Sequence, residues 1–350
     1  MAFAESVGAA GADLLRGVFV AYEVATGIAD AAPIADIKWD MGIYDTLGAA
    51  AGFCGILRLD PRQTANAISL AVTPSIPLRV TREHPPSDWR SLACAHAGMT
   101  ALFATRLARA GVTGPPGPFE GRNGIFDTVF PRCVPRFGAA PFGVERGSAK
   151  VYAACGEGQS AVDAALRLHP KLHGADIARV LIQSTPATWR YLGGGRGDRA
   201  ERWDPPSRES ADHSLPYMVA NVLMDGAIDP ATYSEPRLAQ RAWAPLIAII
   251  ETAADPELAT EGLAELNPCR LTVELADGTS LSEYSTFPYD GSGASVVTPA
   301  HIGAKFDQLV GQALPPAAAR ALRDLLARLE DAPDLAALGA HLRCFGAPSA

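Results

Sequence analysis

Lysine is scarce in this 350-residue chain. Lys38, Lys150, Lys171 and Lys305 are the four lysines among 30 basic residues, and no run of basic residues occurs. The formal net charge is −8 at pH 7. Without a basic patch, the sequence does not favour a nucleic-acid partner. Because arginine supplies most of the positive charge, each lysine is a separate candidate for a specific role.

The chain also lacks long apolar runs and closely spaced cysteines. No apolar stretch reaches the roughly 18 residues of a membrane span, and the first residues have neither the basic start nor the apolar core of a signal peptide. We therefore expect a cytoplasmic protein without a membrane partner. The six cysteines form no CxxC pair and show no metal-ligand spacing, which predicts neither a metal site nor an iron–sulfur cluster.

Hydrophobic residues make up 48% of the chain, enough for a large core and two domains. Apolar residues spaced three and four apart predict helices in the first and last thirds. The predicted helices cover residues 3–30, 45–58, 61–72, 91–111, 300–310 and 316–329.

The middle third has a mixed pattern. Residues 156–168 read as a helix, residues 177–184 alternate like a strand, and residues 270–275 and 281–287 flank an Asp-Gly pair like a hairpin. The sequence predicts a mostly α protein, with an all-helical domain and an inserted α+β domain. We place the helical domain at residues 1–145 plus 299–350, and the α+β domain at residues 146–298.

The densest polar segment is residues 208–217, Arg-Glu-Ser-Ala-Asp-His-Ser-Leu-Pro-Tyr. Pro216 and Gly226 predict a helix between them, whose N-terminus would suit a carboxylate or phosphate ligand. Asp212, His213 and Tyr217 are candidate acid–base groups there. The alternative is that Asp212 or Ser214 only caps the helix and that His213 forms a hydrogen bond with a loop carbonyl.

Two other segments carry candidate binding groups. Arg82, Ser87 and Arg90 lie in a proline-containing loop before a helix, and guanidinium geometry favours bidentate binding of carboxylates. Lys150 precedes the helix that starts near residue 156, where its ammonium and free N–H groups could bind a carboxylate. The alternatives are ordinary loop polarity and a solvated surface lysine. The glycine-rich residues 193–197 lack both nucleotide-binding patterns, so no nucleotide cofactor is expected.

Four segments together resemble the 2-methylcitrate dehydratase family, also called MmgE/PrpD. They are Arg82-Glu-His-Pro-Pro-Ser-Asp-Trp-Arg90, the Tyr-Glu pair at residues 22–23, the lysine-to-Gln-Ser segment of residues 150–160, and the Ala-Asp-His-Ser-Leu-Pro-Tyr helix within residues 209–226. The resemblance runs in order through nearly the whole chain.

Such a resemblance implies a helical domain with an α+β lid, a homodimer, and an active site in the cleft between the domains. It implies cofactor-free chemistry on small di- or tricarboxylates, as in dehydration of 2-methylcitrate in propionate metabolism, decarboxylation of cis-aconitate, or epimerisation of an iminodicarboxylate. Lys150, His213, Asp212 and Tyr217 would then be catalytic. The substrate-binding candidates are Arg82, Ser87, Arg90, Tyr44 and Gln159.

The sequence also departs from the family pattern. It begins where members are already well into the helical domain, so we expect a shortened helical domain or a start upstream of Met1. The family commonly has lysine at the position of Arg90 and histidine near residues 39–41. Because arginine is a poor proton-transfer group, Arg90 could preserve binding and lose acid–base work.

We therefore expect a hydro-lyase-like enzyme on a small polycarboxylate. Two other interpretations stay open. The first is an impaired or non-catalytic family remnant that acts as a binding or structural protein. The second is a pathway-specific decarboxylase or isomerase that acts on another acid.

Overall fold

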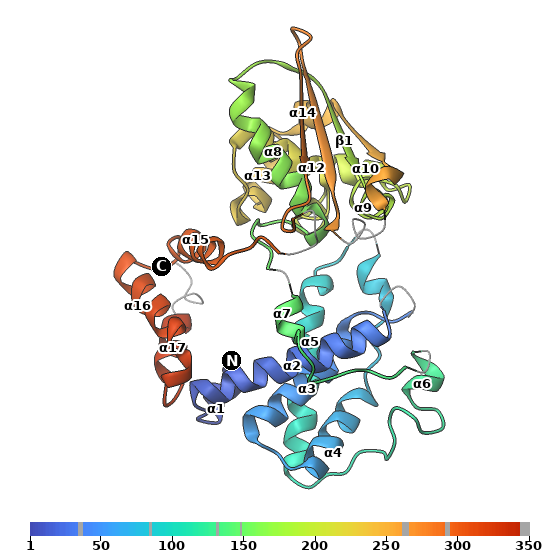
Figure 1. Ribbon diagram of the computed structural model, residues 1–350, viewed down its shortest axis with the longest axis vertical. Coiled ribbons are helices and arrows are strands. Elements are labelled where there is room, and N and C mark those ends of the chain that lie inside the picture. The colour runs from blue at the N-terminus through green and yellow to red at the C-terminus, as the bar shows by residue number, and fades with distance from the viewer. Residues whose placement is uncertain are drawn as a thin grey trace. The chain divides into compact units, whose positions relative to one another are not determined.

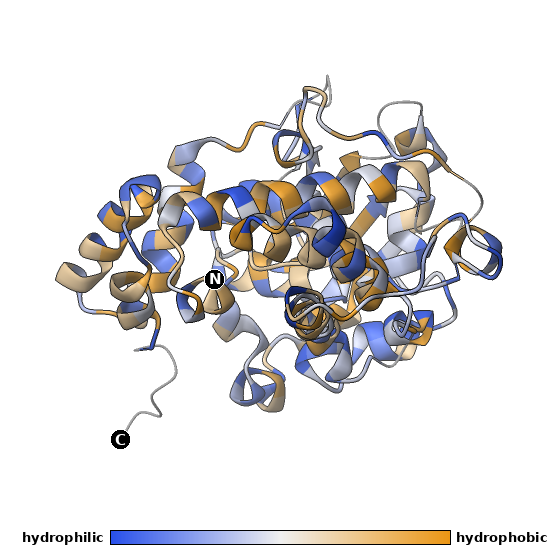
Figure 2. Cartoon of the chain, turned by 90° about the horizontal axis from the view of Figure 1, so that it is seen from below, coloured by the Kyte–Doolittle hydropathy of each residue, from blue (hydrophilic) through white to orange (hydrophobic). Residues whose placement is uncertain are grey.

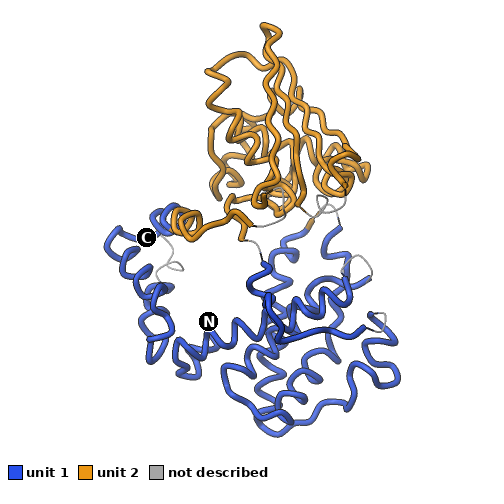
Figure 3. Tube along the Cα trace, in the orientation of Figure 1, with its two compact units in different colours: residues 1–83, 87–147, 307–350 blue, residues 84–86, 148–306 orange. Residues whose placement is uncertain are grey.

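The computed structural model describes residues 1–33, 38–83, 86–130, 133–147, 149–260, 266–290 and 295–343. The chain forms two compact units, coloured separately in Figure 3. The first unit comprises residues 1–83, 87–147 and 307–350, and the second comprises residues 84–86 and 148–306. Among the described residues, no helix is long and apolar enough to cross a membrane. The protein is mostly α, with one small sheet.

In the described residues of the first unit, all of the regular elements are helices. In chain order they are α1 (Ala2–Ser6), α2 (Gly11–Ala31), α3 (Gly42–Leu57), α4 (Pro61–Val72), η1 (Arg79–Arg82), α5 (Trp89–Arg109), α6 (Ile125–Thr128), α7 (Gly143–Arg146), α16 (Pro316–Ala327), η6 (Leu329–Asp331) and α17 (Ala336–Arg343). Helix α3 packs against both α2 and α5, and α4 also packs on α5 (Figure 1).

Small residues allow the helices of this unit to approach closely. A β-carbon on Gly48 or Gly52 of α3 would lie 2.7 Å or 2.6 Å from a backbone oxygen of α2. The helix predicted over residues 3–30 is interrupted in the structure, because Gly8 adopts a left-handed conformation with φ +65° between α1 and α2.

The second unit surrounds a four-stranded mixed sheet of order β2-β1-β3-β4. The strands are β1 (Ile177–Ser184), β2 (Ile250–Ala254), β3 (Cys269–Leu275) and β4 (Ser280–Ser285). Strands β1 and β2 are parallel, with Val180 opposite Ile250, whereas β1/β3 and β3/β4 are antiparallel. The predicted strand and hairpin are present. Strand β2 was not predicted, because its short apolar run directly follows a helix and its partner is distant in sequence.

The second unit also contains helices. They are η2 (Gly156–Gly158), α8 (Gln159–Leu172), α9 (Pro186–Leu192), α10 (Arg199–Trp203), α11 (Arg208–Ala211), α12 (Leu215–Asp225), η3 (Pro230–Tyr233), α13 (Glu235–Gln240), α14 (Ala244–Ala248), η4 (Pro256–Ala259) and α15 (Pro299–Val310), whose last residues belong to the first unit. Helix α8 lies against β3 and β4 and also packs on α12 (Figure 1).

Helix α12 is central to the core of the second unit. Ser214 caps its N-terminus by accepting a hydrogen bond from the Tyr217 N–H, and Gly226 ends it in the left-handed conformation. Residues 215–222 are fully buried or nearly so, whereas surface helices alternate hydrophobic and hydrophilic residues in Figure 2. A helix buried on all sides fixes the chain segments at its start, which include His213.

Candidate functional sites

The Asp212–His213 pair lies in the short turn between α11 and α12. The His213 ring nitrogen Nδ1 hydrogen-bonds to Asp212 Oδ1 and lies 3.1 Å from the Glu209 backbone oxygen. The His213 side chain is 12% exposed and that of Asp212 is 36% exposed. A carboxylate and a carbonyl at Nδ1 favour the tautomer with the proton on Nδ1, which leaves the lone pair on Nε2. This is the form of histidine that accepts a proton.

Arg202 is linked by hydrogen bonds to the turn that carries His213. Its side chain is fully buried, forms an ion pair with Asp198 at 2.7 Å, and donates a hydrogen bond from Nη1 to the His213 backbone oxygen at 2.6 Å. The Ser214 hydroxyl in turn donates to the Arg202 backbone oxygen. Sequence reasoning missed Arg202, because a helical arginine reads as an exposed residue. Its i,i+4 spacing from Asp198 was the available signal.

The catalytic candidate Tyr217 lies in the core of the second unit. Its side chain is fully buried, its hydroxyl donates to the Thr232 backbone oxygen at 2.6 Å, and its ring packs edge-on against Trp243. Burial raises the pKa of the Tyr217 hydroxyl to about 12. The Tyr217 hydroxyl therefore already has a hydrogen-bond acceptor within the chain.

The substrate-binding candidate Gln159 also forms its hydrogen bonds within the chain. Its side-chain oxygen accepts from the N–H groups of Val151 and Tyr152, and its amide donates to the carbonyls of Tyr152 and Ala154. Gln159 is 1% exposed. It therefore shapes the segment that directly follows Lys150, and it influences the site only through that segment.

The segments that carry Lys150 and His213 belong to one neighbourhood. A β-carbon on Gly158 of η2 would lie 2.8 Å from the Met218 methyl group of α12. The Tyr233 hydroxyl donates to the Ala153 backbone oxygen at 2.7 Å, and the Tyr233 ring lies 6.1 Å from the Tyr217 ring of α12. The structure therefore brings two of the predicted segments together within the second unit, although they are about 60 residues apart in sequence.

Cys155 lies between these two segments. Its thiol donates to a Glu157 carboxylate oxygen at 2.8 Å. Burial and then the Glu157 charge raise the pKa of this thiol well above its ordinary value. A buried neutral thiol is a poor nucleophile, so Cys155 fills space between the polar groups.

A second polar cluster lies in the first unit. Arg82 donates from Nε and Nη2 to the two carboxylate oxygens of Asp40, at 2.6 Å and 2.9 Å. Asp40 is 2% exposed and Arg82 20% exposed. The bidentate geometry predicted for Arg82 is present, but its partner is a carboxylate of the chain itself, so these two donors are not available for a substrate carboxylate.

Asp45 and Cys94 adjoin this ion pair. Burial raises the pKa of the Asp45 carboxyl above its usual range, although a hydrogen bond with Cys94 opposes the change. Burial and the Asp45 carboxyl raise the pKa of the Cys94 thiol to about 11. Among the described residues, the second Asp45 oxygen, Oδ2, is buried without a hydrogen-bond partner. A carboxyl in this environment favours its protonated form.

The remaining binding candidates of the first unit differ in their environments. The Tyr44 hydroxyl donates to the Ala32 backbone oxygen, and the residue is 6% exposed, so it lies in the core of the first unit. Ser87 is exposed, and its backbone oxygen accepts from the Arg90 N–H at 3.0 Å. Arg90 is 7% exposed in the first turn of α5. Residues 84 and 85 of this loop lie outside the described residues.

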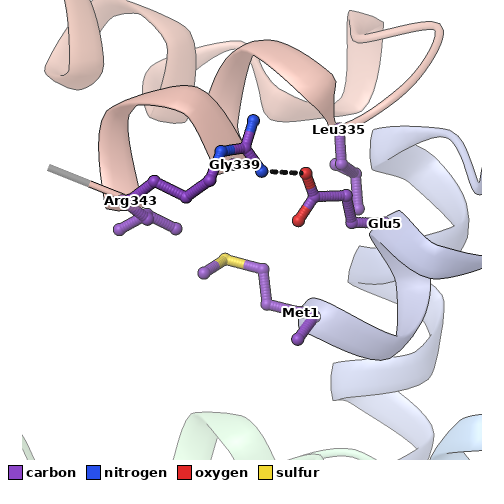
Figure 4. Close-up of a pocket in the computed structure, with 7 residues that line it drawn as sticks. Met1, Glu5, Leu335, Gly339 and Arg343 are labelled. Carbon is purple, nitrogen blue, oxygen red and sulfur yellow. Dashed lines mark hydrogen bonds and ion pairs between the residues drawn. The ribbon is translucent and has the colours of Figure 1, made fainter. Parts of the chain in front are cut away.

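A pocket of about 190 Å³ also lies in the first unit, where α1 meets α17 (Figure 4). Its lining is mostly apolar, and its two charged side chains, Glu5 and Arg343, form an ion pair with each other at 2.8 Å. The pocket therefore offers volume without a reactive group. Within the described part of the chain, no three His, Cys, Asp or Glu side chains gather as metal ligands.

Two family models match this chain. One, described as the MmgE/PrpD N-terminal domain, matches residues 1–137, and the other, the MmgE/PrpD C-terminal domain, matches residues 152–331. Among curated relatives, a 2-methylcitrate dehydratase of Cupriavidus necator is 29% identical over 290 residues, which are 77% of this chain and 57% of the relative.

A mitochondrial 2-methylcitrate dehydratase of Yarrowia lipolytica is 28% identical over 236 residues, which are 64% of this chain and 44% of that protein. The chain thus spans about half the length of the curated relatives it matches. The matches run through both units, and the C-terminal model covers His213 and begins at residue 152, two residues after Lys150. The chain belongs to the MmgE/PrpD family.

Proposed function

We propose that this chain is a cofactor-independent hydro-lyase of the 2-methylcitrate dehydratase type, acting on a small di- or tricarboxylate. The observation that carries the proposal is the Asp212–His213 pair, which Arg202 holds and whose segment packs against the segment that follows Lys150. The names of the curated relatives support the substrate class.

In the proposed reaction His213 Nε2 removes a proton from a carbon beside a substrate carboxylate. Asp212, at the opposite ring nitrogen, stabilises the imidazolium that forms. The electron pair of the broken C–H bond forms the new double bond, and hydroxide leaves from the neighbouring carbon. The His213 imidazolium or the Lys150 ammonium protonates the departing hydroxide to water. The Lys150 charge also stabilises the negative charge that develops on the carboxylate.

The test is proton NMR in deuterated buffer with 2-methylcitrate, citrate, cis-aconitate and itaconate. We expect deuterium exchange or new vinyl signals with at least one acid, and a loss of at least 100-fold in His213→Gln. His173→Gln, an exposed histidine of the same unit, is the matched control. Full activity in both His213→Gln and Lys150→Met would refute the assignment.

A binding protein without turnover is the second candidate, and a specific observation favours it. The Arg82 donors, the Tyr44 and Tyr217 hydroxyls and the Gln159 amide are all occupied by partners within the chain. Calorimetry with the same four acids separates the candidates. Binding of an acid that shows neither exchange nor vinyl signals would favour the binding protein.

We also propose that the chain forms a homodimer through α5. The exposed Trp89, Leu92, His96, Met99 and Phe103 recur every three or four residues along this helix, which is the spacing of a coiled-coil seam. No Asp, Glu, Lys or Arg occurs between residues 91 and 105. Such an apolar stripe on a surface marks an interaction site.

A second copy in antiparallel orientation fits this stripe. Arg106 and Arg109 are exposed at the C-terminal end of α5, and Asp88 is exposed at its N-terminal end. A two-fold axis near His96 would therefore place the arginines beside the partner's Asp88 at both ends of the interface.

Sedimentation equilibrium tests the dimer. We expect a dimer at micromolar concentration, dissociation in Met99→Glu, and no change in Val18→Glu, a matched control on the exposed face of α2. A monomeric wild-type protein, or a dimer that tolerates Met99→Glu, would rule out this interface.

A further inference from the structure

Two of the four lysines meet in the second unit. Lys305, on α15, donates a hydrogen bond from Nζ to the Lys150 backbone oxygen, across 155 residues of sequence. The Lys150 side chain is exposed, and Lys305 is partly buried. In a chain whose other basic residues are almost all arginine, this pairing brings together half of the lysines.

Neither ammonium is neutralised by the chain as described. Among the described residues, no carboxylate forms an ion pair with Lys150 or Lys305, whereas Lys171 pairs with Glu283. Burial and then the charge of Lys150 lower the pKa of Lys305. Two neighbouring positive charges therefore remain without a counterion, and an arriving anion would relieve their repulsion.

The backbone beside Lys150 leads into a helix. A β-carbon on Gly156 would lie 3.6 Å from the Lys150 Cε atom, so the lysine side chain lies over the start of η2. The 3-10 helix η2 runs directly into α8, a 14-residue helix. The Lys150 side chain therefore lies beside the short turn that leads into the N-terminus of α8.

We infer that Lys150 and Lys305 form a two-lysine subsite that binds one carboxylate group of the substrate. One donor of the Lys305 ammonium is used by the Lys150 carbonyl, which fixes its position and leaves two donors for the ligand. A lysine suits this arrangement because its compact ammonium can direct separate N–H donors to the carbonyl and to a carboxylate. The planar guanidinium of an arginine has its donors in a rigid fork, which suits a single carboxylate better. The inference takes only its substrate class from the proposed function.

Competitive amine labelling tests the subsite without turnover. The protein is acetylated with acetic anhydride, with and without propane-1,2,3-tricarboxylate, and the modified lysines are quantified by mass spectrometry. We expect the tricarboxylate to protect Lys150 and Lys305 at least fivefold and to leave Lys171 unchanged. Equal labelling of Lys305 with and without the acid would overturn the inference.

Calorimetry with the same acid tests whether the charge of Lys305, and not only its hydrogen bond to Lys150, contributes to binding. Lys305→Gln keeps an amide that can donate to the Lys150 carbonyl but removes the charge, and we expect it to bind at least tenfold more weakly. Lys171→Met is the control and should bind within twofold of wild type. Unchanged affinity in Lys305→Gln would refute the subsite, even for an active enzyme. Protection of Lys305 in a protein without turnover would keep the subsite and refute the hydro-lyase.

Discussion

The two units differ in how completely they bury their apolar side chains. Ten of the twelve largest fully buried side chains belong to the second unit, among them Trp243, Tyr217 and Met218. Large exposed hydrophobic residues are concentrated in the first unit, along α2 and α5. The second unit therefore has a core of its own, whereas the first presents surface that suits a partner.

The two units also differ in whether their candidate ligand-binding side chains are paired within the chain. In the first unit, the Arg82 donors are matched by Asp40, so the best carboxylate clamp is closed by the chain itself. In the second unit, Lys150 and Lys305 carry charge that no described carboxylate pairs with. The unit with the larger buried side chains therefore also carries the unpaired charge on which the proposed lysine subsite depends.

The largest predicted effect concerns the buried ion pair of the second unit. Arg202→Met leaves Asp198 without its partner and releases the His213 carbonyl, so we expect a loss of about 3–5 kcal/mol in unfolding free energy. Urea denaturation measures this loss. Arg241→Met, which breaks the exposed pair with Asp204, should cost far less stability, because exposed ion pairs are screened by solvent. Equal losses of stability in the two variants would contradict a larger contribution from the buried Arg202–Asp198 pair.

A matched pair of methionines tests the difference in packing directly. Met218→Ala opens a cavity in the core of the second unit and should cost about 2–5 kcal/mol. Met99→Ala, at a residue that is 69% exposed on α5, should stay within about 0.5 kcal/mol for the monomer. A large loss at Met99 under monomeric conditions would show that α5 is packed within its own unit.

The role of Tyr217 can be tested by removing one oxygen atom. Tyr217→Phe loses the hydrogen bond to Thr232 and should cost about 1 kcal/mol while leaving turnover within twofold. Tyr22→Phe, on the exposed face of α2, is the control for stability. A loss of turnover much greater than the loss of stability would restore Tyr217 as a catalytic candidate.

The smallest predicted effect depends on pH and lies in the first unit. Burial raises the pKa of Asp45 in the folded state, so the stability that its protonated form contributes is present at acid pH and is lost as pH rises through the raised value. Asp45→Asn should therefore be more stable than wild type near neutral pH. The gain should shrink as pH falls toward about 4, the ordinary value of an aspartate. A pH-independent difference would contradict this account.

The fold could be predicted from sequence wherever local signals suffice. Helix α4 and strand β1 lie at their predicted residues, and the cap at Gly226 has the expected left-handed conformation. Strand β2 could not be predicted, because its parallel partner β1 is about 70 residues away in sequence. Its five residues are also too few to show a clear alternation of apolar and polar side chains. The mostly α character follows from the apolar spacing of the long helices.

The candidate site was predicted less completely than the fold. The sequence identified His213, Lys150 and Arg82 as polar residues in unusual settings. It could not indicate that Asp40 occupies Arg82, because that pairing spans 42 residues of sequence. Nor could it show that Arg202 is fully buried, since burial depends on what packs around the helix.

The sequence by itself determined the helices, their caps and the residue types available for chemistry, because these depend on neighbours within a few positions. Only the tertiary structure decided which of those side chains keep donors for a ligand. Tyr44, Tyr217 and Gln159 give theirs to backbone carbonyls, while two lysines 155 residues apart come together. The physical reason is that a buried polar group must find a partner, and the folded chain sets which one is within reach.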